Sequence, residues 1–367
     1  MLLKLERSNR ILFLVVLAVA LSFLSVFIYV LWSISFDSED EIPTIVDDGL
    51  MIKTRNANST TDSIILKTIS KETTTPSLRT TTEMNYESHR NYHLFNHKTC
   101  GLTESIVPRI FGGKVARFLS HPWMVVLYAK INSTYKFACG GTLISENLVL
   151  TAAHCIKPRK TAWEIRKIRL GEQNLETDLD CIKLNNGSDY CADPYQEITE
   201  FEFKNWTHQN YSTYFGIEYD IGLIKLKVKA KIHQNNINTI CLPFPPTKEV
   251  NSNSKLEVIG FGKTENKNSS DQLLVAKVPF ISIKECNTIY KTDQFMDTHI
   301  CAGNGTDTDS CRGDSGGPLL ELRKVINKLK VVQYGIVSAG MEDCGKRPGI
   351  YTNVQKYLDW ILENADI

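Results

Sequence analysis

A serine surrounded by glycines is the feature of this sequence that most directly indicates chemistry. Residues 310–318 read SerCysArgGlyAspSerGlyGlyPro, with Ser315 near the centre. Glycine lets the backbone approach a substrate closely and adopt dihedral angles that other residues avoid. The amide N–H groups of Gly313 and Ser315 could therefore point at an oxyanion that develops on a substrate carbonyl. A turn of this composition also arises by chance, so the serine needs partners to be a credible nucleophile.

A candidate base and a candidate orienting acid stand earlier in the chain. His154 follows ThrAlaAla, which in turn follows the apolar run LeuValLeu at 148–150. Asp220 opens an alternating, strand-like run at 219–226. A histidine can take the proton of Ser315, and a third group can orient that histidine. Taken singly, His154 is more often a surface or core residue, and Asp220 a strand-end cap.

The order His154, Asp220, Ser315, each in its own short motif, resembles the chymotrypsin-like, trypsin-type serine peptidases. The resemblance covers about 258 residues, from Ile110 to the end of the chain. Five further stretches agree with that family: ArgIlePheGlyGly at 109–113, CysGlyGlyThrLeuIleSer at 139–145, CysLeuPro at 241–243, GlyPheGly at 260–262 and ProGlyIleTyrThrAsnVal at 348–354.

The resemblance implies an all-β fold of two six-stranded antiparallel β-barrels with the active site between them. Short alternating strands separated by Gly, Pro and Asn turns, such as residues 123–128, are typical of closed antiparallel barrels. Apolar residues recur at helical spacing in 354–363, which predicts an amphipathic C-terminal helix.

Catalytic roles follow from the same resemblance. Ser315 attacks the scissile carbonyl, and His154 takes its proton and passes it to the leaving amine. Asp220 holds the imidazole in the required tautomer. The amides of Gly313 and Ser315 form the oxyanion hole. No cofactor is required for this chemistry.

Asp309, six residues before Ser315, is placed by the resemblance at the floor of the specificity pocket. A carboxylate there is costly to desolvate unless a cation pairs with it, so the substrate residue before the cut should be Arg or Lys. Ala339 stands where the family usually has an aromatic residue, so the preferences of more distant subsites do not carry over. The remaining substrate-binding residues implied by the resemblance are Ser338, Gly340 and Gly349.

Synthesis as an inactive zymogen is also implied. Cleavage between Arg109 and Ile110 would free an amine that pairs with Asp314. This chain reads IlePheGlyGly where IleValGlyGly is commoner, but the isoleucine is kept.

The ten cysteines all lie between Cys100 and Cys344, and seven Asn-x-Ser/Thr sequons accompany them. This combination favours an oxidising, glycosylating compartment. Spacing alone does not give the connectivity. The family resemblance implies four disulfides: Cys139–Cys155, Cys286–Cys301, Cys311–Cys344 and Cys100–Cys241. The last of these would tether an activation segment at 100–109. Cys181 and Cys191 remain and should pair with each other.

That extra loop pair, followed by AlaAspPro, resembles the arthropod clip-domain proteases. A clip domain needs six more cysteines upstream, and only Cys100 precedes Arg109, so we expect none. The same loop carries oxygen-bearing residues spaced like the calcium ligands of those relatives, in keeping with the oxygen ligands that calcium takes. A polar, solvated loop is the alternative. The candidate ligands are Glu172, Asn174, Thr177 and Asp180.

The N-terminal region predicts a membrane anchor. Residues 11–32 carry no charge and would span about 33 Å as a helix. Basic residues precede the run and acidic residues follow it, which leaves residues 1–10 cytoplasmic and the peptidase outside. A cleaved signal peptide, giving a secreted protein, is the alternative. The threonine-rich stretch 33–99 should form a disordered stem before the peptidase domain at 110–367.

The sequence therefore predicts a membrane-tethered trypsin-like endopeptidase that acts in extracellular processing or a zymogen cascade. Its partners would be protein substrates with exposed Arg or Lys, an upstream activating protease and serpin-type inhibitors. The formal charge of +1, without a basic cluster, gives no reason to expect nucleic acid. An inactive homologue that serves as a binding scaffold, and a stalked surface protein, are the alternatives.

Overall fold

The computed structural model describes most of the chain from residue 85 onward, and all of it falls in one structural unit, Thr80–Ile367. Among the described residues, no helix is both long and apolar enough to cross a membrane, and the expected anchor at 11–32 lies outside them. The described ranges are 85–103, 114–158, 164–203, 207–212, 217–232, 234–263, 269–303, 313–325, 327–340 and 346–365.

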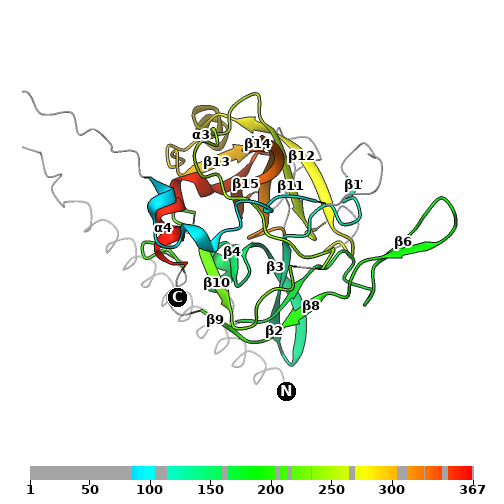
Figure 1. Ribbon diagram of the computed structural model, residues 1–367. Helices are drawn as coiled ribbons and strands as arrows, with labels where there is room; N and C mark the ends of the chain where they lie inside the picture. Colours follow the sequence, from blue (N-terminus) through cyan, green and yellow to red (C-terminus); the bar gives the residue numbers. More distant parts are fainter. Residues whose placement is uncertain are drawn as a thin grey trace, which may run out of the picture. The chain divides into compact units, whose positions relative to one another are not determined.

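The first large sheet has seven antiparallel strands in the order β8-β5-β2-β3-β4-β10-β9 (Figure 1). Strands β8 and β9 are separated by only two residues and pair with β5 and β10, respectively, so together they act as the sixth strand and close this barrel. The bounds are β2 Met124–Ile131, β3 Thr134–Ser145, β4 Leu148–Thr151, β5 Glu164–Leu170, β8 Gln196–Ile198, β9 Phe201–Glu202 and β10 Gly222–Leu226.

The second large sheet also has seven strands, in the order β1-β12-β11-β14-β15-β16-β13. Because β12 pairs with β13 as well, six of these strands close into the expected barrel, and the two-residue β1 is added at its edge. The bounds are β1 Lys114–Val115, β11 Lys255–Gly260, β12 Leu274–Ile281, β13 His299–Ala302, β14 Pro318–Val325, β15 Lys328–Ala339 and β16 Gly349–Asn353.

Burial along the strands follows from their sequences. The central strand β2 is buried from Met124 to Ala129, an almost continuous apolar run. Strand β5 alternates instead, with Ile165 buried between exposed Glu164 and Arg166, as expected where one face of a strand meets water.

The helices of the described residues are few and short. α2 (Ala153–Ile156) follows β4, and α3 (Ile283–Tyr290) begins where the Ser282 side chain accepts a bond from the Glu285 amide. The C-terminal helix expected at 354–363 is split: residues Val354–Tyr357 form a 3₁₀ turn, η3, before α4 (Leu358–Glu363). Asn353 caps that turn, because its side chain accepts a bond from the Gln355 amide.

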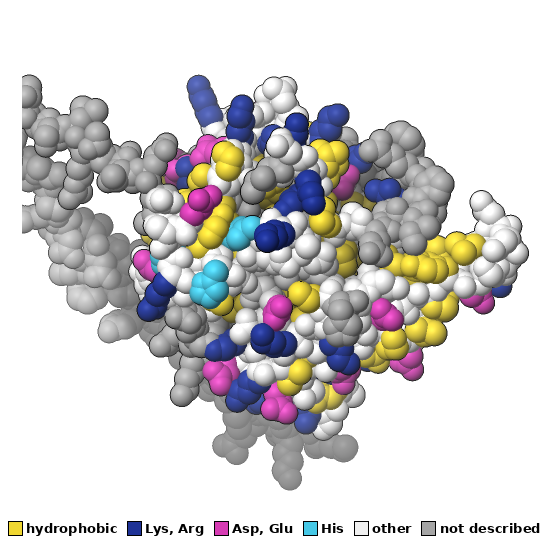
Figure 2. All heavy atoms as spheres, viewed as in Figure 1, with side chains coloured by type: hydrophobic (Ala, Val, Ile, Leu, Met, Phe, Trp, Pro, Cys, Tyr) yellow, Lys and Arg dark blue, Asp and Glu magenta, His cyan; other side chains and the backbone are white. Residues whose placement is uncertain are grey.

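A two-stranded hairpin, β6 (Cys181–Lys183) with β7 (Asp189–Cys191), projects from the body of the domain (Figure 1). Figure 2 shows acidic and basic side chains interspersed over the visible face of the domain, without a broad field of one sign.

The prediction of a disordered stem at 33–99 is wrong for its last part, because residues 85–99 are ordered. Two 3₁₀ turns, η1 (Tyr86–Ser88) and η2 (Tyr92–Leu94), pack against the peptidase domain. The rings of Tyr86, Tyr92 and Phe95 surround Phe244 at centroid distances of 5.6, 5.1 and 5.7 Å. Asn91 is buried and donates to the Leu362 carbonyl in α4 at 2.8 Å. The sequence did not predict this packing, because the aromatic residues of 85–99 are dispersed in a polar segment and show no helical or strand periodicity.

Four disulfides join the described residues: three are pairs that the resemblance implies, and the fourth, Cys181–Cys191, joins the two cysteines that those pairings leave over. Cys311–Cys344 lies outside the described residues. The four are Cys100–Cys241, Cys139–Cys155, Cys181–Cys191 and Cys286–Cys301.

Candidate active site

His154 lies in the short helix α2, directly after the buried strand β4. The Cys139–Cys155 disulfide ties this helix to β3. The backbone amide of His154 donates to Asp220 Oδ1 at 2.9 Å, and its Nδ1 lies 2.8 Å from Asp220 Oδ2. Two bonds from one residue to one carboxylate fix both the backbone and the ring of His154.

Asp220 is fully buried, immediately before β10. Besides the two bonds from His154, its Oδ2 accepts a bond of 2.6 Å from Ser338 Oγ. An ionised carboxylate only accepts, so the His154 proton in this contact lies on Nδ1. The other ring nitrogen, Nε2, is then the one that can take a proton from a nucleophile.

The turn that carries Ser315 sits on β3 and on the end of β4. The Gly140 amide donates to the Ser315 carbonyl at 2.8 Å. Gly316 has φ +77°, and a Cβ there would lie 2.2 Å from Thr151 Oγ1 and 2.5 Å from the Gly140 carbonyl oxygen. Since Thr151 is three residues from His154, these contacts bring the serine turn to the histidine.

The GlyPheGly motif at 260–262 has a local role that the sequence did not reveal. The Gly262 amide donates to Asp314 Oδ1 at 2.8 Å. A Cβ at Gly260 would lie 2.1 Å from that oxygen, and one at Gly262 would lie 2.5 Å from the other carboxylate oxygen. Both glycines therefore make room for the Asp314 side chain, whose expected partner Ile110 is outside the described residues.

Part of the expected specificity pocket can be placed. Ser338 lies near the end of β15 beside Asp220, and the half-buried Ala339 is the last residue of that strand. Gly340 is exposed, with open space where a Cβ would be, and Gly349 begins the buried strand β16. Asp309 is outside the described residues.

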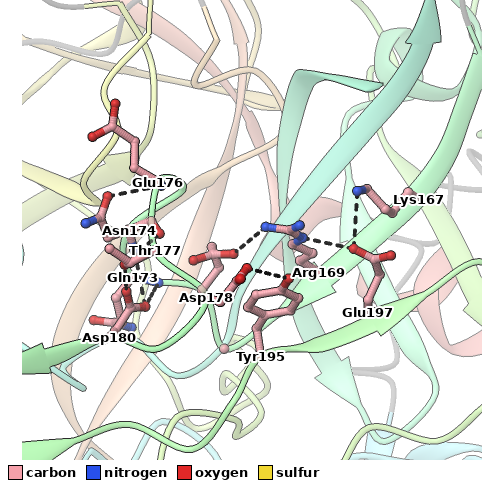
Figure 3. A network of polar contacts seen from close by, with 12 residues as sticks. Lys167, Arg169, Gln173, Asn174, Glu176, Thr177, Asp178, Asp180, Tyr195 and Glu197 are labelled. Atoms are coloured by element: carbon pink, nitrogen blue, oxygen red, sulfur yellow. Dashed lines mark hydrogen bonds and ion pairs between the residues drawn. The ribbon is translucent and has the colours of Figure 1, made fainter. Parts of the chain in front are cut away.

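A separate polar network joins β5 to β8 and to the loop that follows β5 (Figure 3). The Arg169 guanidinium lies 3.1 Å from both Glu172 Oε2 and Glu197 Oε2, and 4.1 Å from the centre of the Tyr195 ring. Lys167 also pairs with Glu197, at 3.2 Å. The network fixes the start of the loop that holds the candidate calcium ligands.

Those ligands fit a calcium ion in part. Glu172 is buried, and its Oε1 has no hydrogen-bond partner among the described residues. Burial, and next the charge of Asp180, raise the pKa of the Glu172 carboxyl to about 7. A cation would relieve both effects. Asp180 fits less well, because its oxygens already accept bonds from the Gln173 and Asn174 amides and from Thr177 Oγ1.

Cys139, His154 and Cys155 also approach one another closely enough to suggest a metal site. The two cysteines form a disulfide with each other, so neither can supply a thiolate.

Comparisons with known proteins place this architecture. The model of the family described as Trypsin matches residues 110–361. The CLIP domain-containing serine protease HP8 of Bombyx mori is 36% identical over 282 residues, which cover 74% of this chain and 73% of the relative. Phenoloxidase-activating factor 3 of Holotrichia diomphalia is 36% identical over 285 residues, covering 76% and 78% of the two chains.

Among solved structures, the crystal structure of the Drosophila Grass clip serine protease of the Toll pathway matches with a TM-score of 0.63 and 35% identity. The match covers 73% of this chain and 75% of the other. The chain belongs to the trypsin family of serine proteases, and clip-domain proteases are among its homologues. A clip domain itself is not evidenced in this sequence.

Proposed function

We propose that this protein is a serine endopeptidase in which Ser315, His154 and Asp220 form the catalytic triad. Ser315 attacks the scissile carbonyl, and His154 Nε2 accepts its proton. The imidazolium is stabilised by the buried Asp220 carboxylate, and the proton then passes to the leaving amine. The amides of Gly313 and Ser315 supply the oxyanion hole.

The observation that carries this proposal is the bonding of Asp220. Its carboxylate takes two bonds from His154 and one from Ser338, which selects the Nδ1–H tautomer of a histidine beside the serine turn. The expected test is covalent labelling of the activated protein by a fluorophosphonate probe, with Ser315→Ala as the unreactive control. Wild-type protein that stays unlabelled would rule the triad out.

That test also decides against the second candidate, an inactive homologue that serves as an extracellular binding scaffold. A scaffold needs neither the ordered His154–Asp220 contact nor a reactive serine.

For specificity, we propose cleavage after Arg or Lys, with Asp309 as the pocket acid. Asp309→Ser should leave probe labelling intact but reduce the preference for basic over apolar residues before the cut. A wild-type preference for aromatic or aliphatic residues would contradict the assignment.

Activation is proposed to follow cleavage between Arg109 and Ile110, after which the Ile110 amine pairs with Asp314. Gly260 and Gly262 leave space for the Asp314 carboxylate, which supports a buried role for it. An uncleavable Arg109→Gln protein should be inert. The Cys100–Cys241 disulfide would keep the upstream piece attached after the cut.

By analogy with a relative named phenoloxidase-activating factor and one of the Toll pathway, we place this enzyme in an extracellular zymogen cascade. Its partners would be an upstream activating protease, a downstream protein substrate and serpin-type inhibitors. Identification of new protein N-termini generated by the active enzyme would test this placement.

We further propose that the peptidase domain faces the cell exterior, with residues 11–32 as a type II anchor. Three described sequons support an extracytoplasmic location, because Asn132, Asn186 and Asn210 are all exposed and could carry N-linked glycans. Asn186→Gln should remove one glycosidase-sensitive mass increment, whereas the neighbouring Asn185→Gln, outside any sequon, should not.

The anchor has its own test, since glycosylation does not distinguish a membrane protein from a secreted one. The expressed protein should resist extraction by carbonate. Release of a species beginning near residue 33–38 would favour a cleaved signal peptide.

Calcium is proposed as a structural ion at the loop of Glu172, not as a catalytic cofactor. The buried Oε1 of Glu172 carries this proposal. Added calcium should raise the melting temperature of the wild type but not that of Glu172→Gln; equal behaviour would show that the loop is merely polar.

A further inference from the structure

The loop that carries Asp220 has an unusual backbone. Tyr219 has φ +56°, a left-handed conformation that non-glycine residues rarely adopt. The Ile221 amide donates to the Tyr219 carbonyl at 2.8 Å, which closes a tight turn around Asp220. Such a conformation persists only where its surroundings hold it. The contacts that hold this loop therefore help to decide where the Asp220 carboxylate lies.

Three strands of the second barrel provide such contacts. Ser338 in β15 donates to the Asp220 carboxylate, and Thr352 Oγ1 in β16 donates to the Asp220 carbonyl at 2.8 Å. The third contact is made by His299 at the start of β13, whose Nε2 lies 3.3 Å from the Ile217 carbonyl oxygen. His299 thus acts three residues before Asp220, at the entry to the loop.

The direction of the His299 bond can be deduced. His299 is 3% exposed, and burial lowers the pKa of its imidazole, which favours the neutral ring. The Met296 amide lies 3.2 Å from Nδ1, and an amide N–H can only donate. Nδ1 is therefore the acceptor, Nε2 carries the proton, and Nε2–H donates to the Ile217 carbonyl.

Apolar packing supports the loop from the same side. Ile217 and Ala339 pack against a cluster that includes the buried Phe295. Two residues after Ile217, the Tyr219 ring stacks on the His208 ring, with centroids 4.6 Å apart and an interplanar angle of 14°. These contacts restrain side chains, whereas the His299 bond restrains the backbone at the loop entry.

We propose that His299 is a positioning residue for the peptidase reaction, and that its bond to the Ile217 carbonyl aligns Asp220 with His154. The proposal rests on the triad stated above. His299 touches neither the substrate nor the reacting atoms and acts through the loop that ends at Asp220. No motif marks it, because its contact spans 82 residues of sequence.

Two substitutions at His299 separate positioning from general stability. His299→Gln keeps an N–H donor at the distance of Nε2, whereas His299→Asn keeps an acceptor near Nδ1 for Met296 but no longer reaches Ile217. With rates normalised to probe-titrated active sites, we expect kcat of the Asn variant to fall about 10-fold, the effect of one neutral hydrogen bond. KM should change by no more than about twofold, because the effect is on the transition state. The Gln variant should recover most of kcat.

Proton NMR provides an independent readout. The downfield signal of the hydrogen bond between His154 Nδ1 and Asp220 should shift or broaden in His299→Asn and remain in His299→Gln. His121→Phe serves as the control, since His121 is also buried but stacks on Trp123, next to strand β2 of the first sheet; it should leave both kcat and the signal unchanged.

The outcomes distinguish this inference from the function on which it rests. If wild-type protein does not react with the fluorophosphonate probe, the proposed triad fails. If wild type reacts and the Asn and Gln variants have equal kcat and the same NMR signal, the positioning role of His299 is overturned. Should His299→Asn fail to fold, His299→Met offers the same loss of the donor with a better-packed side chain, and the same comparison with Gln applies.

Discussion

Substituting Gly316 by alanine tests whether the serine turn is held against β3 and β4 as the structure shows. The new Cβ would lie 2.2 Å from Thr151 Oγ1 and 2.5 Å from the Gly140 carbonyl oxygen. Ordinary contacts to carbon need about 3.5 Å, so the turn must move by about 1 Å. A displacement of that size at a reacting group costs about 100-fold in rate, equivalent to about 2.7 kcal/mol of transition-state stabilisation.

The chain offers a matched control for the backbone strain in this variant. Gly187 has φ +82°, close to the +77° of Gly316, but no atom lies within 4 Å of its would-be Cβ. Gly187→Ala therefore carries the same left-handed penalty, about 1–2 kcal/mol, without the clash. It should lower stability slightly and leave peptidase activity unchanged within about twofold.

The assay is kcat/KM on a peptide amide with a basic residue before the cut, with enzyme concentration set by active-site titration. We expect Gly316→Ala to lose at least about 100-fold relative to Gly187→Ala. Equal activity of the two variants would refute the packing of the Ser315 turn against Thr151 and Gly140.

Three further predictions concern a buried histidine, the glycine beside Asp314 and the Cys100–Cys241 disulfide. Burial lowers the pKa of His121 to about 3, so the ring is neutral when folded but protonated when unfolded below about 6.5; stability should fall from that pH downward, by about 2 kcal/mol at pH 5. Urea titrations at pH 7.5 and 5 should show a smaller loss of unfolding free energy in His121→Phe than in the wild type. An equal loss in the two proteins would contradict the burial argument. Gly262→Ala puts a Cβ 2.5 Å from the Asp314 carboxylate, so cleaved variant protein should label slowly with the probe; labelling at the wild-type rate would count against a role for that contact. Cys100→Ser should lower the melting temperature, yet the piece ending at Arg109 should still co-migrate with the cleaved enzyme on a native gel because Asn91 and its aromatic neighbours pack on the domain; dissociation would show that the disulfide alone holds it.

Much of the fold and the site was predictable because the informative residues are close together in sequence. The motif around Ser315, the histidine after β4 and the acid before β10 are each recognisable within a few residues. The second barrel closes with six strands as expected, and the short strand β1 was missed because two residues carry no periodic signal.

What the sequence could not show are contacts between distant segments. GlyPheGly at 260–262 was recognised only as a match to the family. Its glycines leave room for the Asp314 side chain, and Gly262 and Asp314 are 52 residues apart in the sequence. The role of His299, at the start of β13, depends on its contact with Ile217 in the loop before β10, 82 residues earlier in the chain. The packing of residues 85–99 was hidden because its polar composition is also that of a linker.

If residues 11–32 anchor the chain as proposed, the packing of residues 85–99 has a consequence for how the enzyme is released from the membrane. Tyr86, Asn91 and Phe95 cover Phe244 and reach α4, so this segment serves as part of the domain surface. Shedding that preserves this surface must cut before residue 85, and such a cut differs from the proposed activating cut after Arg109. Solubilisation and activation would then be separate proteolytic events. For the same reason, a recombinant peptidase begun at Ile110 would expose an apolar patch at Phe244 and should aggregate.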